Sequence, residues 1–101
     1  MKIVKLPQAI TDLVETAEYI AENDPDIADR FFDAFEATVQ DICRTPKIGP
    51  AKRYRDTKDI RMWFIAGFEK SLIFYTENTD EIVILRVIHS ARDYTRFFDE
   101  D

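Results

Sequence analysis

The chain of 101 residues contains one cysteine, one histidine and two glycines, and each scarcity excludes a class of protein. The lone Cys43 cannot form an intramolecular disulfide, which excludes a disulfide-stapled secreted fold and favours a reducing cytoplasm. One cysteine and one histidine cannot build a structural zinc site, and two glycines cannot build a glycine-rich phosphate loop. No apolar run approaches the roughly 20 residues that span a bilayer, and the first ten residues lack a signal-peptide pattern. We therefore expect a single cytoplasmic domain over residues 1–101, with no metal, no cofactor and no membrane contact.

Basic residues are also scarce, since 14 Lys and Arg stand against 20 Asp and Glu, a formal net charge of −6. The deficit is local: residues 7–41 hold ten acids and the single base Arg30, whereas residues 52–98 hold nine bases and seven acids. An acidic first half suits a solvated surface and repels phosphate, which nucleic-acid-binding proteins contact through clustered Lys and Arg. The chain is therefore not a generic nucleic-acid binder, and its second half keeps the bases available for a partner.

Two helices are predicted in the first half of the chain. Residues 2–6 are rich in β-branched residues and predict a strand that ends at Pro7. Apolar residues at three- and four-residue steps then predict a helix over 8–22, with Ile10 and Val14 on its apolar side and Asp12 on its polar side. Asp24 is predicted to cap a second helix, which ends at Thr45 because Pro46 follows. A link of about three residues predicts an antiparallel helical hairpin.

The second half has β patterns. Strands are predicted at 60–65, 71–76 and 81–88, with a short one near 52–55 and a mixed tail over 89–101. Residues 81–88 are so apolar that we expect them to be central in the sheet. The order predicts an α+β fold, in which an N-terminal strand and a two-helix antiparallel hairpin combine with a twisted, mostly antiparallel sheet.

These segments, in this order, resemble the RelE/ParE superfamily of type II toxin–antitoxin toxins. The resemblance covers nearly the whole chain and rests on residues 7–21 (PQAITDLVETAEYIA), 24–31, 45–49 (TPKIG), 60–61, 71–75 (SLIFY), 82–89 (IVILRVIH) and 91–93 (ARD). It implies the toxin fold of two helices packed on a sheet and a cognate antitoxin that wraps around the toxin. It also implies a toxin–antitoxin hetero-oligomer that meets DNA only through the antitoxin.

The superfamily contains two activities, and the residues favour one of them. The first helix, the Phe-rich second helix and the ILRVIH…RD ending are more similar to ParE-like toxins, which implies inhibition of DNA gyrase. The alternative is a RelE-like endoribonuclease that cuts mRNA on the ribosome, where Arg61, His89 and Arg92 would supply the cations and the proton transfer. If Arg92 is the strand-end arginine of the nucleases, the tyrosine expected six residues later is replaced by Phe98. A non-toxic, antitoxin-binding co-repressor is a further alternative.

Six residues are the predicted contacts to the target or the antitoxin: Arg61, Trp63, Arg86, His89, Arg92 and Tyr94. Each has a structural alternative. The strand arginines can pair with acids such as Glu77 or Glu81, His89 can be a hydrogen-bonded structural group, and Trp63 can pack within the sheet. Phe31 or Phe32 is also predicted at the edge of its helix stripe, in reach of an antitoxin.

Overall fold

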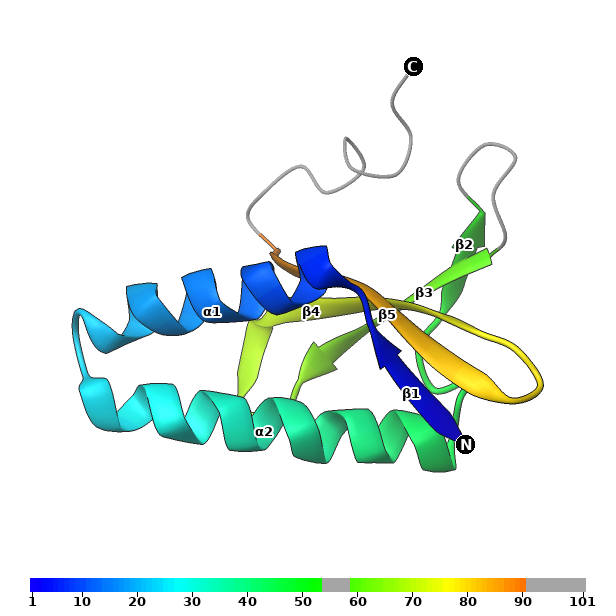
Figure 1. Ribbon diagram of the computed structural model, residues 1–101, viewed down its shortest axis with the longest axis horizontal. Helices are drawn as coiled ribbons and strands as arrows, with labels where there is room; N and C mark the ends of the chain where they lie inside the picture. Colours follow the sequence, from blue (N-terminus) through cyan, green and yellow to red (C-terminus); the bar gives the residue numbers. More distant parts are fainter. Residues whose placement is uncertain (54–58, 91–101) are drawn as a thin grey trace, which may run out of the picture.

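The computed structural model describes residues 1–53 and 59–90. The elements follow the chain as β1 (Lys2–Lys5), α1 (Pro7–Ala21), α2 (Pro25–Arg44), β2 (Ala51–Arg53), β3 (Asp59–Ile65), β4 (Phe68–Glu77) and β5 (Glu81–His89). Figure 1 shows α1 and α2 side by side as an antiparallel hairpin. The predicted contacts Arg92 and Tyr94, together with Phe98, lie outside the described residues.

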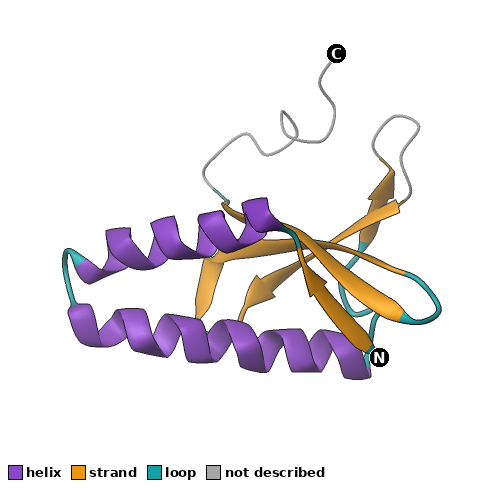
Figure 2. Cartoon of the chain, viewed as in Figure 1, coloured by secondary structure: helices purple, strands orange, loops and turns teal. Residues whose placement is uncertain are grey.

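The five strands form one sheet in the order β1-β5-β4-β3-β2. β1 pairs with β5 in parallel, and the other three pairings are antiparallel. Figure 2 shows both helices on the same side of this sheet. The α+β prediction is therefore confirmed. The apolar strand expected to be central, β5, is an interior strand between β1 and β4, whereas β4 occupies the middle position.

Helix α2 forms as its residues predict. Asp24 has extended backbone angles, and its carboxylate accepts a hydrogen bond of 3.0 Å from the amide of Asp26, while Pro25 occupies the first turn. The buried face carries Phe31, Phe35, Thr38, Val39 and Ile42. Phe31 is wholly buried and Phe32 is 38% exposed, so Phe32 is the one of the two that lies at the predicted edge of the helix stripe.

Helix α1 is turned differently from the prediction. Ile10 and Val14, expected on the buried side, are 48% and 45% exposed, while Asp12, expected in solvent, is 6% exposed. The buried side consists of Ala9, Asp12, Leu13 and Ala17. The physical cause is a set of hydrogen bonds between Asp12 and β5, described below, which periodicity cannot register.

The sheet carries apolar residues on both faces. On the helix side, Phe31 and Phe35 belong to the main core together with Ile65, Ile73, Ile82 and Ile84 of the strands. A second cluster contains Ile60, Leu72, Phe74 and Ile88. Register shifts interrupt β3–β4 pairing at Phe64/Ile65 and β4–β5 pairing at Phe74/Tyr75. Such irregularities bend and twist a sheet, and the second one lies beside the arginine of β5.

Candidate functional site

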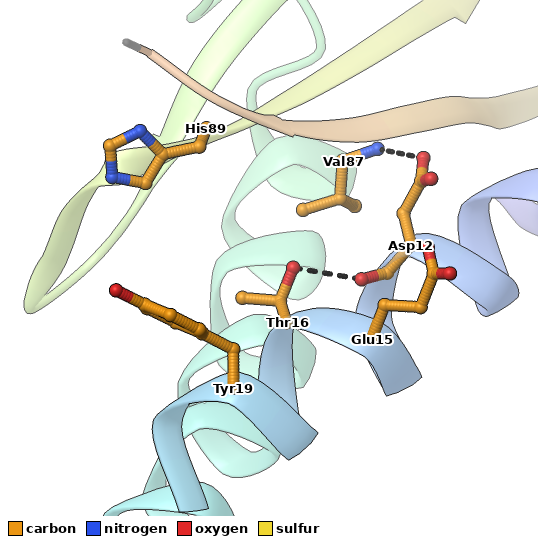
Figure 3. Close-up of a pocket in the computed structure, with 6 residues that line it drawn as sticks. All are labelled: Asp12, Glu15, Thr16, Tyr19, Val87 and His89. Carbon is orange, nitrogen blue, oxygen red and sulfur yellow. Dashed lines mark hydrogen bonds between the residues drawn. The ribbon is translucent and has the colours of Figure 1, made fainter. Parts of the chain in front are cut away.

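A groove runs between α1 and the end of β5. It consists of two cavities of about 430 Å³ each, whose walls share Thr16, Tyr19 and His89. Figure 3 shows Tyr19 and His89 facing each other across the groove, one from α1 and one from β5. Tyr19 is 68% exposed, an unusual state for an aromatic ring. Gly67 of the β3–β4 turn and Phe68, the first residue of β4, also line the second cavity.

A carboxylate–guanidinium pair borders the groove through Asp12, which lines one of the two cavities. Arg86 donates through Nε to Oδ2 of Asp12 at 2.8 Å and through Nη2 to Oδ1 at 3.1 Å. The same carboxylate accepts from the amide of Val87 at 3.0 Å and from the side-chain amide of Gln8 at 3.1 Å. The two side chains are only 7% and 19% exposed. This clasp, defined as Asp12 with Arg86, joins α1 to β5 with the two-pronged geometry that makes such pairs strong.

The prediction for Arg86 therefore needs one correction. Its expected acidic partner was Glu77 or Glu81, but the guanidinium is paired with Asp12, which lies 74 positions earlier in the chain. A contact from Arg86 to a target stays a prediction.

Arg61 belongs to a second group of charges, beside the link between α2 and β2. Its Nη1 donates to the carbonyl of Gly49 at 2.8 Å, and its Nε lies 3.6 Å from Oε1 of Glu77. Lys47 donates to the same carboxylate oxygen at 3.0 Å. The predicted pairing of Arg61 with Glu77 is confirmed, and its guanidinium is directed toward the protein's own backbone and this acid.

Tyr75 anchors the same link from inside the core. Its hydroxyl donates to the carbonyl of Pro46 at 2.8 Å and accepts from the amide of Gly49 at 3.1 Å. Burial raises the pKa of the Tyr75 phenol above its ordinary value, although the Gly49 hydrogen bond and the nearby Arg61 charge oppose that rise. The phenol is therefore a neutral structural group at physiological pH.

The structure separates Arg61 from His89. Arg61 is opposite Tyr75 on one side of β4, and His89 is opposite Ser71 on the other side. The four steps from Ser71 to Tyr75 correspond to roughly 13 Å along the strand. Trp63 is half-buried, packs against the main core and stacks on Phe64 with ring centroids 4.7 Å apart. The predicted contact residues Arg61 and His89 therefore lie in two separate places, one beside the α2–β2 link and one in the groove.

Sequence reasoning missed Asp12 and Tyr19, which belong to the groove. The burial of Tyr75 agrees with a core position, but the hydrogen bonds of its hydroxyl to the link were not predicted. The sequence gives little indication that Asp12 is buried, because aspartate is common on the solvent-exposed side of a helix. Tyr19 was visible within the YIA segment but carried no indication of its exposure.

Comparisons with known proteins address the family. A family model described as "ParE toxin of type II toxin-antitoxin system, parDE" matches residues 3–94. The chain belongs to the ParE toxin family. A solved structure titled "Chromosomal ParDE TA system from P. aeruginosa" matches with a TM-score of 0.66 at 20% identity, covering 88% of this chain and 95% of that one. At this identity the match shows only that the two chains share a fold. No curated protein sequence matches the chain.

Among residues 1–53 and 59–90, no three His, Cys, Asp or Glu side chains are grouped as metal ligands. In the same part of the chain, no helix is both long and apolar enough to cross a bilayer.

Proposed function

We propose that this toxin inhibits DNA gyrase and is neutralised by a cognate antitoxin in a toxin–antitoxin hetero-oligomer. The observation that carries the proposal is the ParE family match over residues 3–94. The 20% identical ParDE structure adds the fold over most of the chain. The toxin acts by binding a protein, so it needs exposed contact surface rather than a set of reacting groups.

The arrangement of charges supports binding over RNA cleavage. Metal-free cleavage of RNA requires a proton acceptor, a proton donor and a cation that converge on one phosphate. Within the described residues, Arg61 points to Gly49 and Glu77, whereas His89 lies in the groove on the other side of β4. These two members of the alternative nuclease set therefore do not converge.

We assign the target contact to the groove walls. An exposed aromatic ring next to a concave apolar surface is the usual composition of an interface anchor. Tyr19 supplies that ring, and His89 and Phe68 line the surface beside it. The contact also accounts for the exposure of 68% of the Tyr19 side chain.

The test uses purified toxin, gyrase and relaxed or supercoiled plasmid. We expect wild-type toxin to block supercoiling and to accumulate cleaved plasmid, and we expect Tyr19→Ala and His89→Ala to lose most of this effect. Glu18→Ala, at an exposed position on the same helix, is the matched control and should inhibit normally. Intact gyrase activity at toxin concentrations that arrest growth would overturn the proposal. Cut mRNA in those cells would favour the ribonuclease alternative, and normal growth would favour the co-repressor.

A further inference from the structure

The second half of β5 is an open strand edge beside the groove. Strand β1 pairs with β5 only over residues 81–84 and ends just before α1 begins. Beyond that point, all the described residues that pair with residues 86–89 belong to β4. A strand that is paired on one side only presents a row of backbone N–H and C=O groups to which another chain can add. Strand β5 is therefore interior at its start and an edge strand at its end.

The pairing pattern shows which backbone groups of β5 point toward α1. The amide of Val87 donates to Oδ2 of Asp12 rather than to β4, whereas the amide of Ser90 donates to the carbonyl of Lys70 at 2.7 Å. Along an antiparallel pair, consecutive residues direct their N–H and C=O groups to alternate sides. The carbonyl of Val87 and the peptide groups of His89 are therefore directed to the side on which α1 lies.

Helix α1 does not close this edge along its full length. The carboxylate of Asp12 joins the helix to the strand at Val87, but the two cavities of about 430 Å³ each separate them where Tyr19 and His89 face each other (Figure 3). Such volumes are in the usual range for ligand pockets. The space between α1 and the end of β5 is therefore open to an extended chain, with the clasp left intact.

The cavity beside the clasp is acidic. It is lined by Glu15, an exposed acid that forms no ion pair with any described residue. The neighbouring carboxylate of Asp12 is already neutralised by Arg86. A ligand with Lys or Arg at this point is complementary to the unpaired charge. A second copy of the toxin would instead bring another acidic α1 against it, which disfavours self-association.

The other cavity suits an apolar side chain. Ile20 and Phe68 line it, and its acid and base, Glu69 and Lys70, are of opposite sign. The Glu69 carboxylate also accepts a hydrogen bond of 2.9 Å from the amide of Gly67. In an extended strand, side chains two residues apart lie on the same side, about 6.8 Å from each other. One strand can therefore place a basic residue in the first cavity and an apolar residue in the second.

We propose that the groove binds an extended segment of gyrase, which adds a short strand to the open end of β5. The segment carries Lys or Arg beside Glu15 and, two positions away, an apolar side chain between Ile20 and Phe68. The identity of the partner rests on the proposed function, whereas the strand geometry rests on the open edge. Binding of this kind converts the end of β5 from an edge strand to an interior strand.

The first experiment uses overlapping synthetic peptides that cover the gyrase sequence, with binding to purified toxin followed by fluorescence anisotropy. The same series includes peptides from the toxin itself and from the product of the short reading frame adjacent to its gene. We expect the tightest peptides to come from gyrase and to carry Lys or Arg two positions from an apolar residue.

N-methylation of the bound peptide tests strand addition. In an added strand, alternate amides face β5 and donate to it, whereas the amides between them face away. Affinity should therefore fall at least about tenfold when the first kind is methylated and stay within about twofold for the second kind. A segment bound as a helix or an irregular loop has no such period of two.

Charge reversal in the whole toxin tests the acidic cavity. Glu15→Lys should raise the toxin concentration that half-inhibits gyrase supercoiling about tenfold, because it places a like charge against the basic residue of the segment. Glu18→Lys makes the same charge change at an exposed position of α1 outside both cavities and should inhibit as wild type. Circular dichroism shows whether each variant is folded.

Several results would overturn the inference while leaving gyrase inhibition intact. They are normal inhibition by Glu15→Lys, a methylation effect that does not alternate along the peptide, and the absence of any gyrase peptide that binds. Binding only by peptides of the toxin or of the adjacent reading frame would assign the groove to a second copy or to the antitoxin. Failure of the proposed function is a separate result, since wild-type toxin would then leave supercoiling unaffected.

Discussion

Removing one member of the clasp between Asp12 and Arg86 should destabilise the fold more than replacing both members with apolar residues. Asp12→Ala removes a carboxylate that accepts four hydrogen bonds and leaves the guanidinium of Arg86 without that partner in a site where it is 19% exposed. Removing one member of a buried pair costs about 3–5 kcal/mol. Because Arg86 retains some solvent contact, we expect a loss near the lower value, about 3 kcal/mol, in the free energy of unfolding.

The double variant Asp12→Leu, Arg86→Met separates the charge from the packing. Apolar side chains of similar volume remove the desolvation cost together with the attraction, so the double variant should unfold within about 1 kcal/mol of wild type. The double variant should also remove the side-chain contacts that fix the rotation of α1 about its axis. The helix could then turn and bury Ile10 and Val14 more deeply. A single cysteine placed at position 10 in a Cys43→Ala background should then react more slowly with a thiol reagent.

The assay is urea unfolding followed by the fluorescence of Trp63, the only tryptophan, which is half-buried. Glu15→Ala, exposed on α1 one turn from Asp12, is the control and should change stability by less than about 0.5 kcal/mol. The reasoning is refuted if Asp12→Ala costs less than about 1 kcal/mol, or if the double variant is as unstable as the single one.

Four further variants test the link between α2 and β2, the β3–β4 turn and the cap of α2. Gly49→Ala should destabilise the fold by about 3 kcal/mol in thermal or urea unfolding, because a Cβ would lie 2.5 Å from the carbonyl oxygen of Met62. Gly67→Ala meets no neighbouring atom within 4 Å but adopts a φ of +83°, so it should cost only about 1 kcal/mol; equal losses at the two glycines would contradict this account. Tyr75→Phe should cost about 1–2 kcal/mol at pH 7 by removing two hydrogen bonds. Since burial raises the folded-state pKa of Tyr75, its unfolded form ionises first, and the stability it contributes below about pH 10 should decline at higher pH in wild type but not in Tyr75→Phe. A stability difference between the two proteins that stays constant from pH 9 to pH 11 would contradict that sign. Asp24→Ala should cost about 1 kcal/mol and lower the helical signal near the α2 start, and an unchanged melting temperature would exclude a capping role.

Local patterns predicted the elements well where the deciding interactions are local. The Asp24 cap, the Pro25 start and the buried phenylalanines of α2 all depend on neighbours within a few residues. The strand order could not be obtained in this way, because the parallel pairing of β1 with β5 joins the two ends of the described chain. The apolar strand β5 was expected to be central but lies one position from the middle of the sheet. An apolar sequence indicates only that a strand has a neighbour on each side, which is true of both β4 and β5.

The rotation of α1 shows the limit of periodicity. Ile10 and Val14 satisfy the apolar template as well as Leu13 does, yet the buried position belongs to Asp12. The decisive partner, Arg86, is 74 positions away, so no local window contains both groups. The Arg61–Glu77 pairing was accessible because the two residues sit on adjacent strands of one predicted meander. Contacts of Arg61, Trp63, Arg86, His89, Arg92 and Tyr94 with a target or antitoxin stay predictions.

Gyrase inhibition by the purified toxin tests the central claim most directly. The account predicts that wild-type toxin blocks plasmid supercoiling and traps cleaved plasmid, that added antitoxin reverses both effects, and that Tyr19→Ala is inactive while remaining folded. Gyrase that continues to supercoil plasmid at full rate with a large excess of folded, growth-arresting toxin would contradict it.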